Sequence, residues 1–234
     1  MGLRYQYQQQ GFVSIKGLFS ELECDQIIEH ALAMHARRSI PGCFSSDPQS
    51  NDPLQQYPRM MHPHRVDDLS LQTLKHPKIV EVLEKLLGQE AVGLQTMIYW
   101  KPPHARGQAL HQDDLYLQTQ PGACIAAWIA LEKIDAENGG LTVCPGSQVE
   151  PILEMRPTDT SLSFTDSAVQ PNPIYDHQLV EMGKGETLFF HGRLIHGSKP
   201  NVSSDRFRKT FICHYIPRLS TDYNKGYDPQ VELK

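Results

Sequence analysis

The sequence GETLFFHGRLIHGS occupies residues 185–198 and combines a strand-like run with a turn. The apolar run Leu188–Phe190 predicts a buried strand. Two histidines follow it, His191 and His196, and glycines adjoin both of them. This stretch therefore predicts a β scaffold that presents imidazole groups where a strand ends.

A second stretch, LHQDDLY at residues 110–116, places a histidine two residues before a carboxylate. If it is a strand, His111 and Asp113 share a face and can bind one ion. The pair alone is weak, because 11 histidines and 27 acidic residues among 234 positions give roughly one such pair by chance. Adding one of the two histidines at 191 and 196 gives two histidines and one carboxylate, the facial triad of non-haem Fe(II) oxygenases. Such a site leaves coordination positions open to oxygen and a co-substrate.

From residue 91 onward, short β-type runs dominate the sequence, and clusters of Pro, Gly, Asn and Asp separate them. The 17 prolines disfavour a helix bundle. We expect an antiparallel β sandwich or barrel with supporting helices, in one domain over residues 1–234. The predicted runs are Gly93–Trp100, Ala123–Leu131, Gly140–Val143, Glu186–His191 and Phe207–Tyr215.

The sequence before residue 91 predicts two helices. Ser20 and Glu23 form a capping box at the start of a helix over Glu21–Met34. A second helix is expected over Asp68–Leu87, with Gly88 as its stop signal.

The remaining segments carry weaker signals. The opening residues are expected to be extended, with a short strand over Gly11–Ile15. The polar, proline-rich stretch 37–68 is expected to be a lid or a disordered segment. The tail over residues 217–234 is expected either to fold over the barrel mouth or to be free.

Composition limits the classes of function. Lys plus Arg is 22 and Asp plus Glu is 27, so the net charge of 22 − 27 = −5 argues against nucleic acid or an anionic membrane as partner. The longest apolar run, Ala123–Leu131, is short of the roughly 20 residues that span a bilayer, and no signal peptide opens the sequence. The five cysteines form no CxxC pair, so we expect reduced, buried thiols and a cytoplasmic protein.

These residues together resemble the phytanoyl-CoA dioxygenase family of Fe(II)/2-oxoglutarate-dependent oxygenases. The resemblance covers nearly the whole chain, and its motifs are specific in combination. They are YQQQGFVSIKGLFS at 7–20, LLG at 86–88, HQD at 111–113, the strand with Trp128, ENGG at 137–140, PGS at 145–147, FFHGRLIHGS at 189–198 and FRK at 207–209.

The resemblance implies a mainly β fold with supporting helices, a double-stranded β-helix (a cupin-like jelly roll). Its helical section would cover about residues 20–90, its jelly-roll core about 91–216 and its C-terminal tail 217–234. The catalytic iron ligands would be His111, Asp113 and His196. The resemblance implies that Arg208 and Ser198 bind the distal carboxylate of 2-oxoglutarate, with Gln95, Trp128 and Tyr99 nearby.

Some assignments stay open between alternatives. Arg206 and Arg208 both fit the distance from His196 within one residue, and they share a strand face, so parity does not choose; the FRK context favours Arg208. His62, in the basic stretch 59–65, and Arg106 are candidates for substrate contact, and a solvated basic loop is the alternative.

Other histidines are expected to have structural roles. His191 is expected to support the site or the fold rather than bind metal, and His214 to be buried and hydrogen-bonded. Related halogenases have Gly or Ala at the position of Asp113, so the resemblance implies oxygenation and not halogenation.

The expected function is an Fe(II)- and 2-oxoglutarate-dependent dioxygenase. It would use O2 to hydroxylate an aliphatic C–H bond of a small molecule, with release of succinate and CO2. The alternative is a cupin-like protein that binds a metal or a small acid without turnover. An oxygenase acting on nucleic acid is disfavoured by the acidic charge balance.

Overall fold

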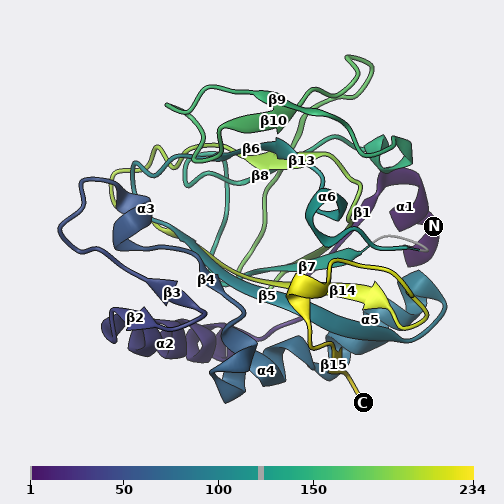
Figure 1. Ribbon diagram of the computed structural model, residues 1–234, viewed down its shortest axis with the longest axis horizontal. Helices are drawn as coiled ribbons and strands as arrows, with labels where there is room; N and C mark the ends of the chain where they lie inside the picture. The colour runs from purple at the N-terminus through teal and green to yellow at the C-terminus, as the bar shows by residue number, and fades with distance from the viewer. Residues whose placement is uncertain (1, 121–123) are drawn as a thin grey trace.

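Two antiparallel sheets face each other in the computed structural model, which describes residues 2–120 and 124–234. Figure 1 shows the larger sheet across the middle of the molecule, with the smaller sheet on one side and helices on the other. The larger sheet has the order β1 (Phe12–Ile15), β12 (Thr187–His191), β7 (Ile125–Ala130), β14 (Arg208–Pro217), β5 (Ala91–Lys101) and β15 (Val231–Glu232), with β4 (Met60–Met61) also paired to β5. The smaller sheet has the order β11 (Gln178–Val180), β8 (Leu141–Val143), β13 (His196–Ser198) and β6 (Gln108–His111).

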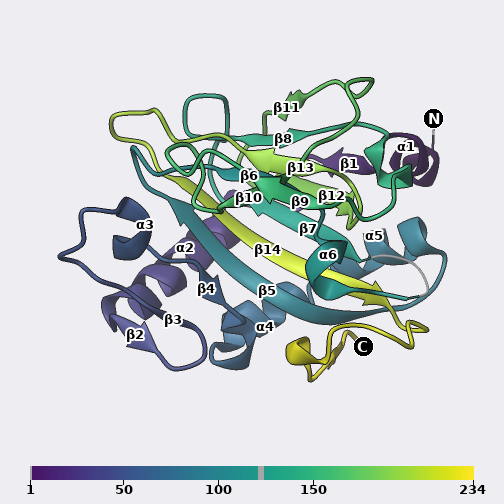
Figure 2. The ribbon, with the colours of Figure 1, turned by 45° about the horizontal axis from the view of Figure 1, so that its top comes forward.

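This arrangement is the predicted jelly-roll architecture, and the five predicted β runs correspond to β5, β7, β8, β12 and β14. Ala123, where one predicted run begins, lies outside the described residues. Two small hairpins complete the β structure, β2 (Ser39–Ile40) with β3 (Phe44–Ser45) and β9 (Met155–Pro157) with β10 (Ser167–Val169). Figure 2 shows β14 lying between β5 and β7.

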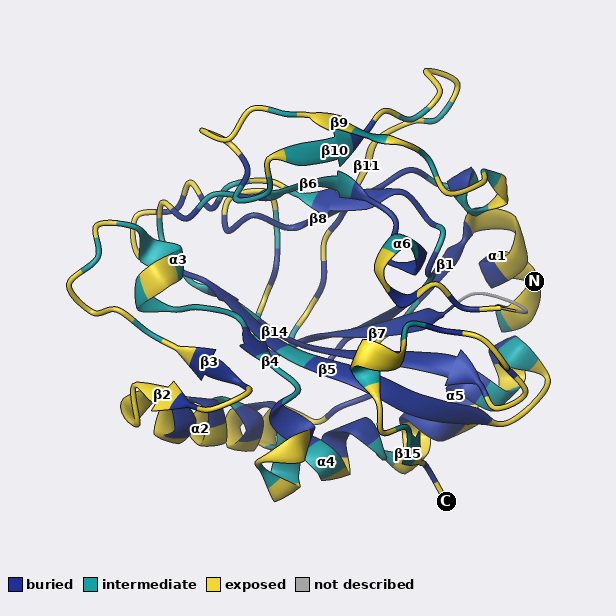
Figure 3. Ribbon diagram, viewed as in Figure 1, coloured by how far each residue is buried: buried dark blue, intermediate teal, exposed yellow. Residues whose placement is uncertain are grey.

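Strand β7 shows why the larger sheet is buried on both faces. Ile125, Ala127 and Ile129 point into the core beneath the helices. Their neighbours Ala126, Trp128 and Ala130 point into the core between the two sheets. Alternate residues of a strand face opposite sides, so helix packing on one face and a second sheet on the other account for a continuous apolar run. Figure 3 shows these central strands buried.

The helices on the outer face begin and end at the predicted signals, with one exception. Helix α2 (Glu21–Ala36) has a complete capping box between Ser20 and Glu23. The predicted helix over Asp68–Leu87 is wrong as a single element: it is two helices, α4 (Asp68–Leu74) and α5 (Pro77–Leu87). A proline disfavours helical backbone in the residue before it but suits the first turn of a helix, so Pro77 ends one helix and starts the next. Gly88 ends α5 in a left-handed conformation with φ 71°.

Two further expectations differ from the structure. The opening residues are not extended, because α1 (Leu3–Gln10) is a helix that ends at Gly11. Only Tyr7 of α1 is buried, so the sequence has no apolar periodicity from which this helix could be predicted. The stretch 37–68 is not irregular. It contains β2, β3, α3 (Pro53–Gln56), β4 and the 3₁₀ turn η1 (Pro63–Arg65), and β4 joins the edge of β5.

Short helical turns fill several connections between strands. They are α6 (Asp114–Leu117), η2 (Ser147–Val149) and η3 (Lys225–Tyr227). All five cysteines are free and buried, as predicted. No helix among residues 2–120 and 124–234 has the length and apolar character needed to cross a bilayer.

The capping box of α2 yields a test of stability. Hydrogen bonds from the backbone N–H and hydroxyl of Ser20 lower the pKa of Glu23 to about 2. A lowered folded-state pKa stabilises the fold above the ordinary pKa, and this contribution is lost as the pH falls toward 2. Glu23→Gln should therefore lower the free energy of unfolding by about 0.5–1 kcal/mol at pH 7 and by much less near pH 2.5, in urea denaturation.

Glu21→Gln is the matched control, because Glu21 lies in the same helical turn but outside the capping box. It should cost less than Glu23→Gln at pH 7. An equal loss for Glu23→Gln at both pH values would contradict the assigned role of the carboxylate.

Candidate metal centre

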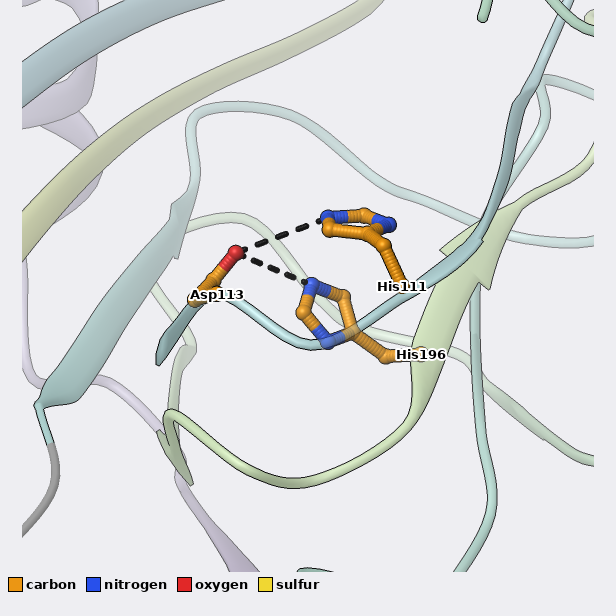
Figure 4. A group of neighbouring side chains, drawn as sticks. All are labelled: His111, Asp113 and His196. Atoms are coloured by element: carbon orange, nitrogen blue, oxygen red, sulfur yellow. Dashed lines mark ion pairs between the residues drawn. The ribbon is translucent and has the colours of Figure 1, made fainter. Parts of the chain in front are cut away.

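Three buried side chains from two chain segments converge where β6 and β13 meet. His111 is the last residue of β6, His196 is the first residue of β13, and the two face each other in the antiparallel register. Asp113 Oδ1 lies 3.5 Å from Nε2 of His111 and 3.7 Å from Nε2 of His196 (Figure 4). One ligand atom from each of the three residues lies within 4.8 Å of the others.

The geometry that brings Asp113 to the histidines differs from the sequence prediction. Strand β6 ends at His111, and Asp113 has helical backbone angles, φ −61° and ψ −33°, at the start of α6. Asp113 therefore does not share a strand face with His111. The turn from strand into helix directs its carboxylate back toward the two imidazoles.

The protonation of both imidazoles suits metal binding. Nδ1 of His111 lies 2.9 Å from the carbonyl oxygen of Ala109, and Nδ1 of His196 lies 2.9 Å from that of Leu194. A carbonyl oxygen only accepts, so each Nδ1 carries the hydrogen and donates it. Each Nε2 then carries the lone pair that a metal ligand requires, and that of His111 accepts from the side-chain amide N–H of Gln108 at 3.1 Å in this structure.

Electrostatics favour a neutral imidazole at His196 and an ionised carboxylate at Asp113. Burial, together with His111, lowers the pKa of His196 to about 4, so its imidazole is neutral at pH 7. Burial alone would raise the pKa of Asp113, but His196 and His214 hold it well below its usual value. Two imidazoles and one carboxylate, buried together, are a donor set that fits a divalent iron.

His214, in the middle of β14, controls the orientation of the carboxylate. Its Nε2 lies 3.1 Å from Oδ2 of Asp113, and its side chain is buried. This contact occupies one carboxylate oxygen and leaves Oδ1 facing the two imidazoles. His214 is thus buried and hydrogen-bonded, as the sequence predicts.

A cavity of about 330 Å³ opens from the three ligands between the two sheets. All five residues expected near a co-substrate line it, from strands β5, β7, β13 and β14: Gln95, Tyr99, Trp128, Ser198 and Arg208. The structure therefore brings together the predicted metal ligands and the predicted co-substrate residues.

Arg208 has the features of an anion-binding residue. It is 1 % exposed, and its guanidinium carbon lies 4.4 Å from the centre of the Tyr99 ring and 5.4 Å from that of Trp128. Nη1 donates to the carbonyl oxygen of Gly139 at 3.2 Å, but Nε and Nη2 have no partner among the described residues. Buried N–H groups left without an acceptor are costly, so these two donors fit a carboxylate bound in the cavity.

Arg206 lies elsewhere. Its Nη1 is 3.0 Å from both Asp135 Oδ2 and Glu137 Oε2, and it does not line the cavity. The residue precedes β14, so the strand parity that failed to separate it from Arg208 does not apply to it.

The two candidates for substrate contact, His62 and Arg106, are not on the cavity wall. Arg106 forms an ion pair of 2.5 Å with Asp52, and the His62 ring packs 5.8 Å from the ring of Tyr227. Arg59, from the same basic stretch as His62, does line the cavity and lies 4.6 Å from the ring of Phe164.

Three cavity residues were given no role in the sequence, Met97, Gln108 and Tyr116, whereas Met61 lies in the basic stretch 59–65 and Tyr227 in the C-terminal tail, both of which were expected near the substrate or the barrel mouth. Met97, Gln108 and Tyr116 belong to no motif, since they reach the cavity from three separate elements, β5, β6 and α6. His191 is outside the cavity and accepts a hydrogen bond from the backbone N–H of Arg193.

Comparisons with known proteins agree with this geometry. The family model described as phytanoyl-CoA dioxygenase (PhyH) matches residues 7–210. A probable phytanoyl-CoA dioxygenase of Caenorhabditis elegans is 33% identical over 160 residues, which are 64% of this chain and 51% of that protein. The peroxisomal phytanoyl-CoA dioxygenase of Bos taurus is 34% identical over 150 residues, 59% of this chain and 43% of that protein. The chain thus spans about half the length of the curated relatives it matches.

Solved structures share the fold. The epimerase SnoN in complex with Fe3+, alpha ketoglutarate and nogalamycin RO has a TM-score of 0.75 and 20% identity, covering 96% of this chain and 86% of that chain. EctD from S. alaskensis with bound Fe has a TM-score of 0.71 and 17% identity, covering 93% of this chain and 77% of that chain.

The contact between His214 and Asp113 yields a prediction. His214→Ala should weaken Fe(II) affinity about 10–100-fold, because loss of a hydrogen bond that orients a metal ligand has effects of this size. Anaerobic calorimetric titration measures it. His191→Ala, which removes a histidine outside the cavity, should change the affinity less than twofold; equal losses in the two variants would contradict the orienting role of His214.

Proposed function

The chain belongs to the phytanoyl-CoA dioxygenase family, and we propose that it is an Fe(II)- and 2-oxoglutarate-dependent dioxygenase hydroxylating an aliphatic C–H bond of a small molecule. The reaction converts the C–H bond, O2 and 2-oxoglutarate into the alcohol, succinate and CO2. One observation carries the proposal: a buried His-Asp-His cluster shares one cavity with a buried arginine that has two donors free. This pairing matches a molecule that binds metal at one end and carries a carboxylate at the other.

The residues divide the work between two ends of the cavity. Nε2 of His111, Nε2 of His196 and Oδ1 of Asp113 would hold iron, and iron with 2-oxoglutarate supplies the oxidising chemistry. At the far end, Arg208 and Ser198 would bind the distal carboxylate. The fork of Arg208 offers Nε and Nη2 in the planar geometry that a carboxylate accepts.

The cavity walls orient the co-substrate and exclude water. Trp128 and Tyr99 pack against the Arg208 guanidinium and limit its movement. Gln95, buried on β5, also lines the cavity and supplies a hydrogen-bonding side chain. Between the two ends, the lining includes Leu141, Phe190 and Ile212, which keep water away from the reacting groups.

Substrate would enter from the less buried side of the cavity. Tyr116 is 40% exposed, and Arg59 and Tyr227 are partly exposed, whereas the metal ligands are buried. The stretch 37–68 contributes Arg59 and Met61 to this side, and the C-terminal tail contributes Tyr227. Both segments therefore act as covers of the entrance in this proposal, and His62 and Arg106 stay candidates for contact with the outer part of a substrate.

The alternative, a cupin-like protein that binds metal or a small acid without turnover, differs in a measurable outcome. Anaerobic addition of Fe(II) and 2-oxoglutarate should produce a charge-transfer absorption band, and O2 should then yield succinate even without substrate. His111→Ala and Asp113→Ala should each lower succinate formation at least about 100-fold, since each removes a ligand. A band without succinate would favour the binding protein, and full activity in both variants would exclude this metal site.

The two arginines give a matched pair of variants. Arg208→Gln should raise KM for 2-oxoglutarate about 10–100-fold, the cost of losing hydrogen bonds to a charged group. Arg206→Gln removes an equal charge at the surface and should change KM less than twofold. Steady-state assays of succinate formation compare them; a larger effect from Arg206→Gln would reverse the assignment.

We also propose a cytoplasmic location and a small molecule, rather than nucleic acid or membrane, as the partner. Five buried free thiols suit a reducing compartment, and the net charge of −5 disfavours polyanions. Some relatives are named as peroxisomal proteins. Fractionation of the source cells with an antibody to the chain tests the location, and recovery in an organelle fraction would contradict it.

A further inference from the structure

Lys101, the last residue of β5, is a fully buried lysine without a carboxylate partner among the described residues. Its Nζ donates to Ser198 Oγ at 2.9 Å, to the carbonyl oxygen of Gly139 at 3.3 Å and to that of Lys199. Three acceptors match the three N–H groups of an ammonium ion. Buried lysines are rare unless they are paired with an anion, because an unpaired charge is unfavourable away from water. We therefore expect an anion to bind close to Lys101.

The contact with Ser198 determines how that hydroxyl can be used. Ser198 Oγ accepts a hydrogen bond from Lys101 Nζ and another, at 3.3 Å, from the backbone N–H of Gln108. A serine hydroxyl has two lone pairs and one hydrogen, so both lone pairs are occupied. Its hydrogen has no acceptor among the described residues, and Ser198 lines the cavity. Lys101 thereby leaves Ser198 only the role of a donor toward the cavity.

Lys101 and Arg208 are tied together through one glycine. The carbonyl oxygen of Gly139 accepts from Lys101 Nζ and from Arg208 Nη1. Gly139 has φ 80°, and a Cβ there would lie 3.0 Å from Cδ of Lys101 and 2.6 Å from the carbonyl oxygen of Lys199. Only glycine allows this close approach. The ENGG turn thus anchors both cations at one end of the cavity.

The free donors at this end select the chemistry of a ligand. They are Nε and Nη2 of Arg208, the Tyr99 hydroxyl, which also has no partner among the described residues, and the hydrogen of Ser198. Donors without acceptors suit a group that only accepts, and an ionised carboxylate has about four acceptor sites.

We propose that Lys101 is a positioning residue for the co-substrate, which fixes Ser198 as a donor and adds a second positive charge behind Arg208. It makes the cavity select a 2-oxo acid with a second carboxylate over one with an apolar end. This inference rests on the proposed function, because it assumes that a 2-oxo acid binds the metal. Burial and the charge of Arg208 lower the pKa of Lys101 well below its usual value. A carboxylate bound nearby would oppose this effect, because its negative charge stabilises the protonated form of the lysine.

The test compares two acids that differ only at the distal end. The probes are 2-oxoglutarate and 2-oxovalerate, which has the same five carbons but no second carboxylate. Anaerobic titration of the Fe(II)-loaded protein, followed by the charge-transfer absorption, gives the Kd of each. Lys101→Met should weaken 2-oxoglutarate about 10–100-fold and change 2-oxovalerate less than twofold, since only the first acid uses the donor and the charge.

A double-mutant cycle examines the route through Ser198. Ser198→Ala should weaken 2-oxoglutarate about tenfold. In the Ser198→Ala background, Lys101→Met should weaken it less than in the wild-type background, because part of its effect passes through that hydroxyl. Lys209→Met is the control: it removes a lysine on the neighbouring strand that pairs with Glu132 and does not line the cavity. Both Kd values should stay within twofold of the wild type.

The outcomes separate this inference from the proposed function. If the wild-type protein gives no absorption with 2-oxoglutarate, the proposed function fails and this inference fails with it. If the wild type binds 2-oxoglutarate, three results would overturn the inference alone. Lys101→Met could leave the Kd of 2-oxoglutarate unchanged, or it could raise the Kd of both acids equally. The effects of Lys101→Met and Ser198→Ala on the Kd of 2-oxoglutarate could also be fully additive. Should Lys101→Met not fold, Lys101→Gln keeps N–H donors for the two carbonyls and serves the same comparison. Ser198→Ala also overturns the inference if it weakens neither acid.

Discussion

The pairing of β6 with β13 is the constraint on which the site depends. It sets His111 opposite His196, with ring centres 4.2 Å apart, and the turn after β6 returns Asp113 to the same point. Side chains alternate between the faces of a strand, so a slip of one residue would turn one imidazole out of the cavity. The second imidazole nitrogens are fixed by backbone carbonyls two residues upstream, so the local chain sets both position and tautomer. A rigid donor set of this kind is what metal catalysis requires of a scaffold.

The far end of the cavity depends on buried positive charge. Arg208 and Lys101 are both buried, and neither forms an ion pair within the part of the chain that the structure describes. Burying two cations is unfavourable without an anion, so the fold carries this cost at the place where a dianionic co-substrate would offset it. The metal end instead carries the carboxylate of Asp113 between two imidazoles. The cavity therefore matches a ligand that chelates a cation at one end and presents an anion at the other.

The sequence predicted the β core and the candidate site residues better than it predicted helix boundaries and the burial of single charged residues. The buried run around Trp128 predicted a strand of the core, and the histidines at 111 and 196 were predicted as metal ligands, which the structure brings together with Asp113. Residue type, spacing and family motifs agree at these positions. Parity could not separate Arg206 from Arg208, since the choice depends on where β14 begins and on which acidic residues lie outside it. Lys101 was missed because a lysine at a strand end gives no sign of burial. Helix α1 was not predicted because only one of its residues is buried, so its apolar pattern is weak. The break at Pro77 was not predicted because the apolar pattern continues across it.

One measurement tests the central claim, that a single cavity holds iron at His111, Asp113 and His196 and a dicarboxylic 2-oxo acid against Arg208. Crystals grown anaerobically with Fe(II) and 2-oxoglutarate would be measured at wavelengths on either side of the iron absorption edge. The account predicts one anomalous peak in contact with the three ligands, and density from it to the Arg208 guanidinium and the Ser198 hydroxyl. A peak bound by other residues, or a carboxylate held by Arg206 instead, would contradict it.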